Sequence, residues 1–189
     1  MPDFTLTAKP PLDGIRIDLD GVSVKEISDR QLVSISIPRN GEAPLNQAVM
    51  NAYRLELPVV GTSTVTPATD VRLMGIQRDQ LFLLCERTGD NPVAAVSEVL
   101  GNAGYYTDQS DSWAVLELSG PQSRRVLERI CPVDLAPDQF AVNAVTRTVM
   151  EHLGVIVLRT GADTFMLFSA TSSALSFLGA IETSARNVL

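Results

Sequence analysis

Short segments in which apolar and polar residues alternate recur along the chain, and each predicts a half-buried β-strand. Between them, apolar residues recur every three or four positions, as they do on the buried face of a helix. Small polar residues at 61–69 predict a loop, which is also the one suitable place for a domain boundary. In the first half these patterns predict strands at 15–20 and 32–37, a helix at 43–55, a strand hairpin at 71–76 and 81–85, a helix at 92–100 and a strand at 113–118.

The second half nearly repeats this order. Its patterns predict a helix from Pro121 to about Ile130, strands at 145–149, 153–158 and 165–169, and a closing helix at 172–186. Strand, helix, strand, strand, helix, strand is the split βαβ or ferredoxin-like order, in which helices cover one face of an antiparallel sheet. We therefore predict an α+β fold of two interlocked ferredoxin-like units. Residues 1–30 form an irregular lead-in and edge strand, 31–118 the first unit, and 113–189 the second, with the strand 113–118 shared by both.

Charge and composition narrow the classes of partner. The 189 residues include 15 Lys and Arg against 22 Asp and Glu, which gives a formal net charge of −7. This sign argues against nucleic acid and anionic membranes as partners. With 45% hydrophobic and 20% charged residues, the chain has the composition of a globular protein, so disorder throughout is excluded.

The sequence carries no visible targeting or membrane segment. Its first residues, Met1–Leu6, have neither the basic nor the apolar region of a secretory signal. The longest apolar run, 153–158, is far shorter than the roughly 20 residues that span a membrane. We therefore expect a soluble, cytoplasmic protein.

Motifs for metals, dinucleotides and covalent catalysis are absent from the sequence. No G-x-G-x-x-G follows a predicted strand. Cys85 and Cys131 form no C-x-x-C, and a zinc site needs about four ligands where the chain adds a single histidine. Cys85 is expected to be a small buried hydrophobe, and His152 to be a surface or edge residue beside a strand. We therefore predict no catalytic, cofactor-binding or metal-binding residue.

Two segments each have a chemical and a structural interpretation. The acidic stretch from Asp108 to Asp111 could position a cationic amine or act as a base, or its side chains could simply shape a turn. Ser119, Gly120 and Pro121 could expose helix amides to an anion. Alternatively, Ser119 or Gly120 is an ordinary N-cap and Pro121 the first helical residue.

The residues from Trp113 onward have a distinctive order. A strand ends in leucine-serine-glycine-proline at 118–121, an arginine-bearing helix follows, and cysteine-proline-valine-aspartate-leucine at 131–135 precedes Phe140. This order resembles the γ subunit of heterotetrameric sarcosine oxidase. The hairpin at 71–84 and the strand at 159–168 fit the same family. The chain departs from it at Leu81, where tryptophan is common, and at 170–173, where an arginine-serine-aromatic stretch is common.

The resemblance implies a subunit of an αβγδ oxidase that demethylates sarcosine to glycine and hydrogen peroxide, with the methyl carbon passed to tetrahydrofolate. It implies a fold like the folate-binding domain of the glycine-cleavage aminomethyltransferase. It also implies that FAD, FMN, NAD, zinc and tetrahydrofolate are held by the α, β and δ subunits, and that this chain binds no cofactor.

Two other interpretations stay open. One is a free-standing folate-binding module or aminomethyltransferase-like protein, although 189 residues are few for a three-domain transferase. The other is a subunit of an N-methylglutamate-type dehydrogenase. Substrate choice would lie in the flavin subunit, so this sequence does not separate the oxidase from the dehydrogenase.

A chain without a catalytic constellation is expected to work by docking. Interfaces are enriched in aromatic and arginine anchors. The candidates are Tyr105 and Tyr106, between a helix end and a strand, and Arg124, Arg125 and Arg129 on the outward face of the following helix. The alternative for the tyrosines is that one of them caps the local core.

Overall fold

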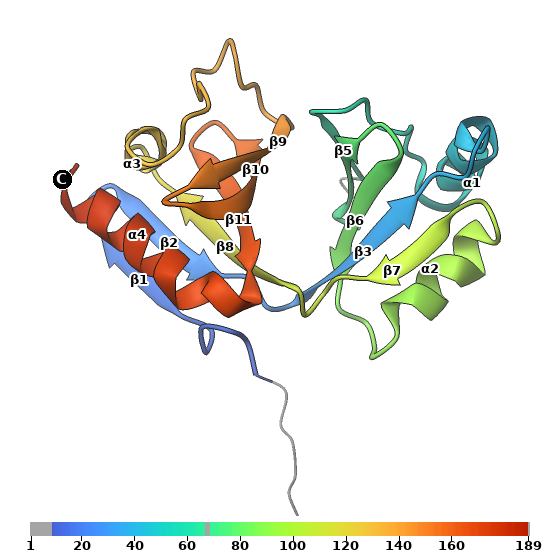
Figure 1. The fold of residues 1–189 in the computed structure, drawn as a ribbon, viewed down its shortest axis with the longest axis horizontal. Helices are drawn as coiled ribbons and strands as arrows, with labels where there is room; N and C mark the ends of the chain where they lie inside the picture. Colours follow the sequence, from blue (N-terminus) through green and yellow to red (C-terminus); the bar gives the residue numbers. More distant parts are fainter. Residues whose placement is uncertain (1–8, 67–68, 189) are drawn as a thin grey trace, which may run out of the picture.

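Two antiparallel sheets face one another, and helices cover their outer sides (Figure 1). The computed structural model describes residues 9–66 and 69–188. Its strands are β1 (Arg16–Leu19), β2 (Val22–Glu26), β3 (Arg30–Ser36), β4 (Ser63–Thr66), β5 (Val71–Gln77), β6 (Gln80–Glu86), β7 (Tyr105–Asp108), β8 (Trp113–Ser119), β9 (Val145–Met150), β10 (Leu153–Gly161) and β11 (Thr164–Ala170). Its helices are α1 (Glu42–Tyr53), α2 (Pro92–Leu100), α3 (Ser123–Glu128) and α4 (Ala174–Arg186), with a 3-10 turn η1 (Thr171–Ser173).

The five-stranded sheet has the order β4-β5-β6-β3-β7. Strands β3, β5, β6 and β7, with α1 and α2 between them, follow the ferredoxin-like order, and β4 is added at the edge. Alternate residues of these strands face the helices. Leu45 and Val49 of α1 and Val96 of α2 pack there against Val33 and Leu83, and all five are buried.

The six-stranded sheet has the order β1-β2-β8-β11-β10-β9. Here β8, α3, β10, β11 and α4 follow the ferredoxin-like order, but the fourth strand is β2, from the N-terminal end of the described chain. Residues Leu116, Phe165 and Leu167 pack against Phe177 and Ile181 of α4. The two units are therefore interlocked, because the N-terminal hairpin completes the C-terminal sheet.

The inner faces of the two sheets share a third apolar core. Met74 and Phe82 of the five-stranded sheet pack with Val115, Ile156 and Phe168 of the six-stranded one. The backbone joins the sheets at one edge as well, in a β-bridge between Thr62 and Ala144. The α+β prediction with two ferredoxin-like units is confirmed.

The assignment of strand 113–118 to the first unit is wrong. In the structure β8 pairs with β2 and β11 in the six-stranded sheet, and the strand that pairs with β3 is β7, at Tyr105–Asp108. The physical reason is that β7 is short, with only Tyr106 facing the helices against Ile35, so it shows little alternation. The observed units are 30–108, and 16–26 together with 113–186.

Two further predictions need correction or restriction. The loop predicted at 61–69 contains β4, whose β-branched residues pair with β5, so a cut there would break a sheet. Residues 67–68, and residues 1–8 of the expected lead-in, lie outside the described part. None of the helices in the described part is long and apolar enough to cross a membrane.

Candidate functional site

The turn at Ser119, Gly120 and Pro121 is built by close backbone contacts. Gly120 has φ +113°, its N–H donates to the Asp163 carbonyl at 3.0 Å, and its carbonyl accepts from Ser123 N–H at 2.9 Å. Helix α3 begins at Ser123 with Gln122 as N-cap. The predicted N-cap at Ser119 or Gly120 is therefore wrong, because Gly120 is used in the turn that precedes the helix.

The same turn does not offer free amides to an anion. Gln122 N–H donates to the Gly21 carbonyl at 3.0 Å and Ser123 N–H donates to Gly120. The Ser123 hydroxyl donates to the Asp163 carbonyl at 3.0 Å. These bonds tie the turn to the β1–β2 hairpin and to the β10–β11 turn, so the turn has a structural role.

The acidic stretch at 108–111 also shapes a turn. The Asp108 carboxylate accepts from Ser110 N–H at 2.9 Å, and the Ser110 hydroxyl accepts from Leu32 N–H at 3.1 Å. Asp111 has a fully exposed side chain, 3.9 Å from the Arg87 guanidinium. The turn interpretation is confirmed, and the stretch is one of the two connections between the sheets.

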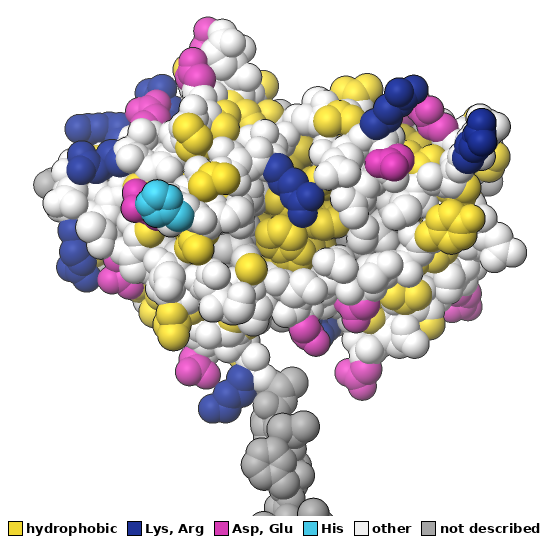
Figure 2. Space-filling view, viewed as in Figure 1, with side chains coloured by type: hydrophobic (Ala, Val, Ile, Leu, Met, Phe, Trp, Pro, Cys, Tyr) yellow, Lys and Arg dark blue, Asp and Glu magenta, His cyan; other side chains and the backbone are white. Residues whose placement is uncertain are grey.

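The five residues of the predicted interface do not form one surface. Tyr105 and Tyr106 lie on β7 of the five-stranded sheet, and the three arginines follow Gln122 on or just after α3, at the other end of the molecule (Figure 1). Basic side chains gather along the edge that carries α3 and α4 (Figure 2). Which of these residues touch a partner stays a prediction.

The two tyrosines differ in their surroundings. Tyr105 is 69% exposed. Tyr106 packs against the core under α1 and α2, its hydroxyl donates to the Gly101 carbonyl at 3.0 Å, and burial raises the pKa of Tyr106. Tyr106 therefore caps the local core, as the alternative interpretation held.

The three arginines also have different partners. Arg124 pairs with Glu128 at 3.3 Å, and Arg125 donates to the Gln122 side chain at 3.1 Å. Arg129 borders a hollow beside α4. These contacts are on the surface, where such pairs add little stability, so the guanidinium groups can exchange them for a partner's.

The two cysteines and the histidine form no disulfide and no metal-binding group among the described residues. Cys131 is buried and Cys85 half-buried, both are free thiols, and burial raises the pKa of each. His152 is exposed with φ +68° in the tight β9–β10 turn, as expected for a surface residue. Within 9–66 and 69–188, no group of three or more His, Cys, Asp or Glu is placed to hold a metal ion.

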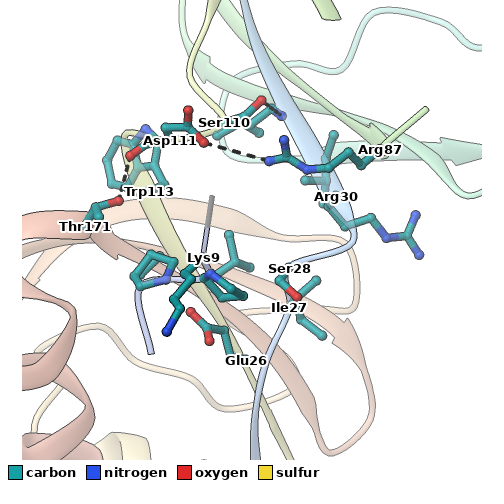
Figure 3. Close-up of a pocket in the computed structure, with 16 residues that line it drawn as sticks. Lys9, Glu26, Ile27, Ser28, Arg30, Arg87, Ser110, Asp111, Trp113 and Thr171 are labelled. Atoms are coloured by element: carbon teal, nitrogen blue, oxygen red, sulfur yellow. Dashed lines mark hydrogen bonds and ion pairs between the residues drawn. The ribbon is translucent and has the colours of Figure 1, made fainter. Parts of the chain in front are cut away.

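A pocket of about 410 Å³ lies where the chain crosses between the sheets (Figure 3). It is lined by Lys9, Pro10, Pro11, Glu26, Ile27, Ser28, Arg30, Leu32, Leu84, Arg87, Ser110, Asp111, Trp113, Ala114, Val115 and Thr171. The segments are far apart in sequence and meet only in the fold. Two parts of this lining stand out in the sequence, Trp113 as a strand residue and the acidic stretch 108–111, of which Ser110 and Asp111 border the pocket.

Two charged side chains of the pocket, Glu26 and Arg30, already have hydrogen-bond partners within the protein. Glu26 is buried and accepts from Leu12 N–H at 2.9 Å and from Gly14 N–H at 2.6 Å, which fixes the segment before β1. Arg30 donates to Asp70 at 2.6 Å. The Trp113 indole N–H is buried and has no hydrogen-bond partner within the part of the chain that the structure describes. The lining contains neither histidine nor cysteine.

A buried arginine on the other side of the shared core joins the two sheets. Arg72 of β5 donates to the Ser63 hydroxyl and to the Asn143 side-chain carbonyl, both at 2.8 Å. Burial lowers the pKa of Arg72, because desolvation disfavours its charge and the negative charge of Asp70 offsets this only in part. Arg72 therefore has a structural role. In the sequence, the only sign of this role is a charged residue within an otherwise mostly apolar strand.

The comparisons with known proteins agree on one family. Residues 40–185 match the family model described as "Sarcosine oxidase, gamma subunit family". The chain is 31% identical over 154 residues to the sarcosine oxidase subunit gamma of Corynebacterium sp. (strain P-1), covering 80% of this chain and 73% of that protein. It is 39% identical over 70 residues to the subunit gamma of Arthrobacter sp., covering 37% of this chain and 34% of that one.

Two solved structures share the fold. A chain of the heterotetrameric sarcosine oxidase from Corynebacterium sp. U-96, in complex with pyrrole 2-carboxylate, superposes with TM-score 0.75 at 24% identity, covering 88% of this chain and 85% of that one. The glycine cleavage system aminomethyltransferase T from Bartonella henselae superposes with TM-score 0.61 at 16% identity, covering 85% of this chain and 45% of that one. At these identities the superpositions show the fold alone, and they agree with the predicted architecture.

Proposed function

The chain belongs to the sarcosine oxidase gamma subunit family, and we propose that it acts as the γ subunit of a heterotetrameric sarcosine oxidase. The observation that carries the proposal is the family match over 40–185. The resemblance first seen in 113–135 is thereby confirmed at the level of the family.

In this proposal the complex demethylates sarcosine oxidatively to glycine, and the methyl carbon passes to tetrahydrofolate. The α, β and δ subunits bind FAD, FMN, NAD, zinc and tetrahydrofolate, and the γ chain works by docking to them in the cytoplasm. Support comes from the Corynebacterium sp. U-96 structure that shares this fold, because it is the structure of a heterotetrameric sarcosine oxidase. An amine-oxidising complex that acts on N-methylglutamate would differ in its catalytic subunit.

Exposed apolar side chains support a docking role. Val59 and Val60 are 72% and 56% exposed, and Val142 is 46% exposed. They lie on the two segments that the Thr62–Ala144 bridge joins. The Val59 carbonyl also packs against Gly75, where a Cβ would lie 2.4 Å from it. Rigid apolar side chains of this kind suit the apolar centre of a permanent interface.

Purification of the chain from its native host, tagged at its own locus, tests the proposal. The expected result is a stable complex with larger flavin-containing subunits in equal amounts, which oxidises sarcosine with release of hydrogen peroxide. A parallel assay with N-methylglutamate identifies the substrate. Recovery of the chain alone, or in a complex that oxidises neither amine, would contradict the proposal.

A further inference from the structure

We propose that the pocket between the two sheets binds a small carboxylate with a flat apolar body, its charge held by Arg87 and its body packed beside Trp113. This site is independent of the docking role proposed above. Its volume, about 410 Å³, is in the range of small-molecule sites.

The apolar floor of the pocket favours a ligand with an apolar body. Leu32 and Leu84 come from the five-stranded sheet, and Val115 comes from the six-stranded sheet. All three are buried and belong to the core between the sheets. Because these three side chains are only 2–8% exposed, the apolar surface that a ligand body would cover is mainly that of Pro10, Pro11, Ile27 and Trp113.

Trp113 adds a fixed aromatic ring to the lining of the pocket. Its indole N–H is buried and has no hydrogen-bond partner among residues 9–66 and 69–188. The ring is held in place by Phe82, edge-on at 6.1 Å between centroids, and by the Arg147 guanidinium 5.8 Å from its centroid. The flat body of a ligand would pack against this fixed ring.

The basic side chains at the rim of the pocket favour a ligand that carries a negative charge. Lys9, Arg30 and Arg87 come from three separate segments. Of the two acidic groups, Glu26 already accepts two backbone N–H groups, and Asp111 is fully exposed. Arg87 is the less committed of the two arginines, because its ion pair to Asp111 measures 3.9 Å, whereas Arg30 donates to Asp70 at 2.6 Å. A guanidinium holds a carboxylate with two parallel hydrogen bonds.

Arg30 is more firmly held than Arg87. Its NH2 group donates to Asp70 at 2.6 Å and its Nε lies 3.8 Å from Asp29. We assign it the secondary role of adding positive charge at the rim, and Arg87 the role of direct contact.

The position of the pocket gives binding a structural consequence. The lining includes both connections between the sheets, 26–30 and 109–112, and the segment at 9–11. A ligand that touches all three holds the two sheets together, so binding raises the melting temperature.

Trp113 is the single tryptophan, so its fluorescence reports directly on the site. The full chain is titrated with 4-ethylbenzoate, with the neutral 4-ethylbenzamide, and with acetate, which has the charge without the body. The expected result is a saturable fluorescence change and a raised melting temperature with 4-ethylbenzoate. Affinity for the amide and for acetate should be at least about tenfold lower.

Substitutions test which residues form the binding site. Arg87→Gln should weaken 4-ethylbenzoate binding about tenfold. Arg78→Gln is the matched control, because Arg78 is exposed in the β5–β6 turn and does not line the pocket. Trp113→Phe, followed by melting temperature, should also weaken binding. No saturation up to roughly 10 mM, equal binding of acid and amide, or unchanged binding to Arg87→Gln would each overturn the proposal. None of these results bears on assembly with other subunits.

Discussion

The carbonyl oxygen of Gly21 occupies the space where a side chain on Gly120 would begin, 2.5 Å from an ideal Cβ. Gly21 lies in the β1–β2 turn with φ +75°, and Gly120 lies between β8 and α3 with φ +113°. Two turns that are about 100 residues apart in the sequence therefore pack backbone against backbone. Gly120, the glycine of the leucine-serine-glycine-proline motif at 118–121, is needed for this contact because it has no side chain.

Gly120→Ala should lower the free energy of unfolding by at least about 2 kcal/mol, because the new methyl group meets the Gly21 carbonyl and the positive φ is strained. Urea unfolding measures the change. Gly179→Ala is the control, since Gly179 is exposed in α4 and its Cβ would meet nothing within 4 Å. That variant should be neutral or more stable. Equal stability of the parent and Gly120→Ala would show that the turn adapts.

Local patterns predicted most elements of the fold, and long-range pairing explains what they missed. Apolar spacing placed α1, α2 and α4 and the hairpins β5–β6 and β10–β11 correctly. β2 was missed although Val22 and Val24 alternate with polar residues, because the strand follows β1 after a tight turn. The sheet to which β8 belongs is decided by its pairing with β2 and β11, which no local pattern encodes.

Arg159 is buried, and its guanidinium binds three backbone carbonyls of neighbouring loops. It donates to the carbonyls of Phe140 at 2.7 Å, Ala162 at 2.5 Å and Gly161 at 3.2 Å. Arg159→Met should lower the free energy of unfolding by about 3 kcal/mol, because buried carbonyls lose charged donors. The control is Arg147→Met, which removes an exposed guanidinium that lies over Trp113 and should cost less than about 1 kcal/mol. Similar losses in both variants would contradict the role of Arg159.

The candidate pocket was beyond sequence reasoning for a different reason. Arg30, Arg87 and Trp113 belong to different strands or loops, and each looks ordinary in its own segment. By contrast, the turn role of Asp108 and the core role of Tyr106 were among the interpretations that local rules offered. Local rules describe neighbours in the chain, whereas a pocket is made by segments that tertiary folding brings together.

Tyr53 should make the protein sensitive to alkali. Burial, followed by the charges of Cys85 and Tyr106, raises the pKa of Tyr53 to about 12. An unfolded tyrosine ionises near pH 10, so the stabilising contribution is complete below about pH 10 and is lost as the pH rises toward 12. Tyr53→Phe should therefore lose less stability than the parent between about pH 10 and pH 12, measured by urea unfolding. Tyr105→Phe, at an exposed position, should follow the parent. Parallel losses in the parent and Tyr53→Phe would exclude this cause.

The separation of Tyr105 from Arg125 predicts that they contribute independently to assembly. Tyr105 lies on β7 and Arg125 on α3, at opposite ends of the molecule. Tyr105→Ala should weaken binding to the partner subunits about tenfold, because an exposed tyrosine is a common interface anchor. Arg125→Glu should weaken binding by charge reversal. Tyr106 is unsuitable for this test, since its packing and its bond to Gly101 mean that Tyr106→Ala would destabilise the chain itself. In co-expressed complexes analysed by size-exclusion chromatography and titration, the free-energy losses of the single variants should add in the double variant. A double variant no weaker than either single one would place both residues at one coupled contact, and unchanged assembly in every variant would remove both from the interface.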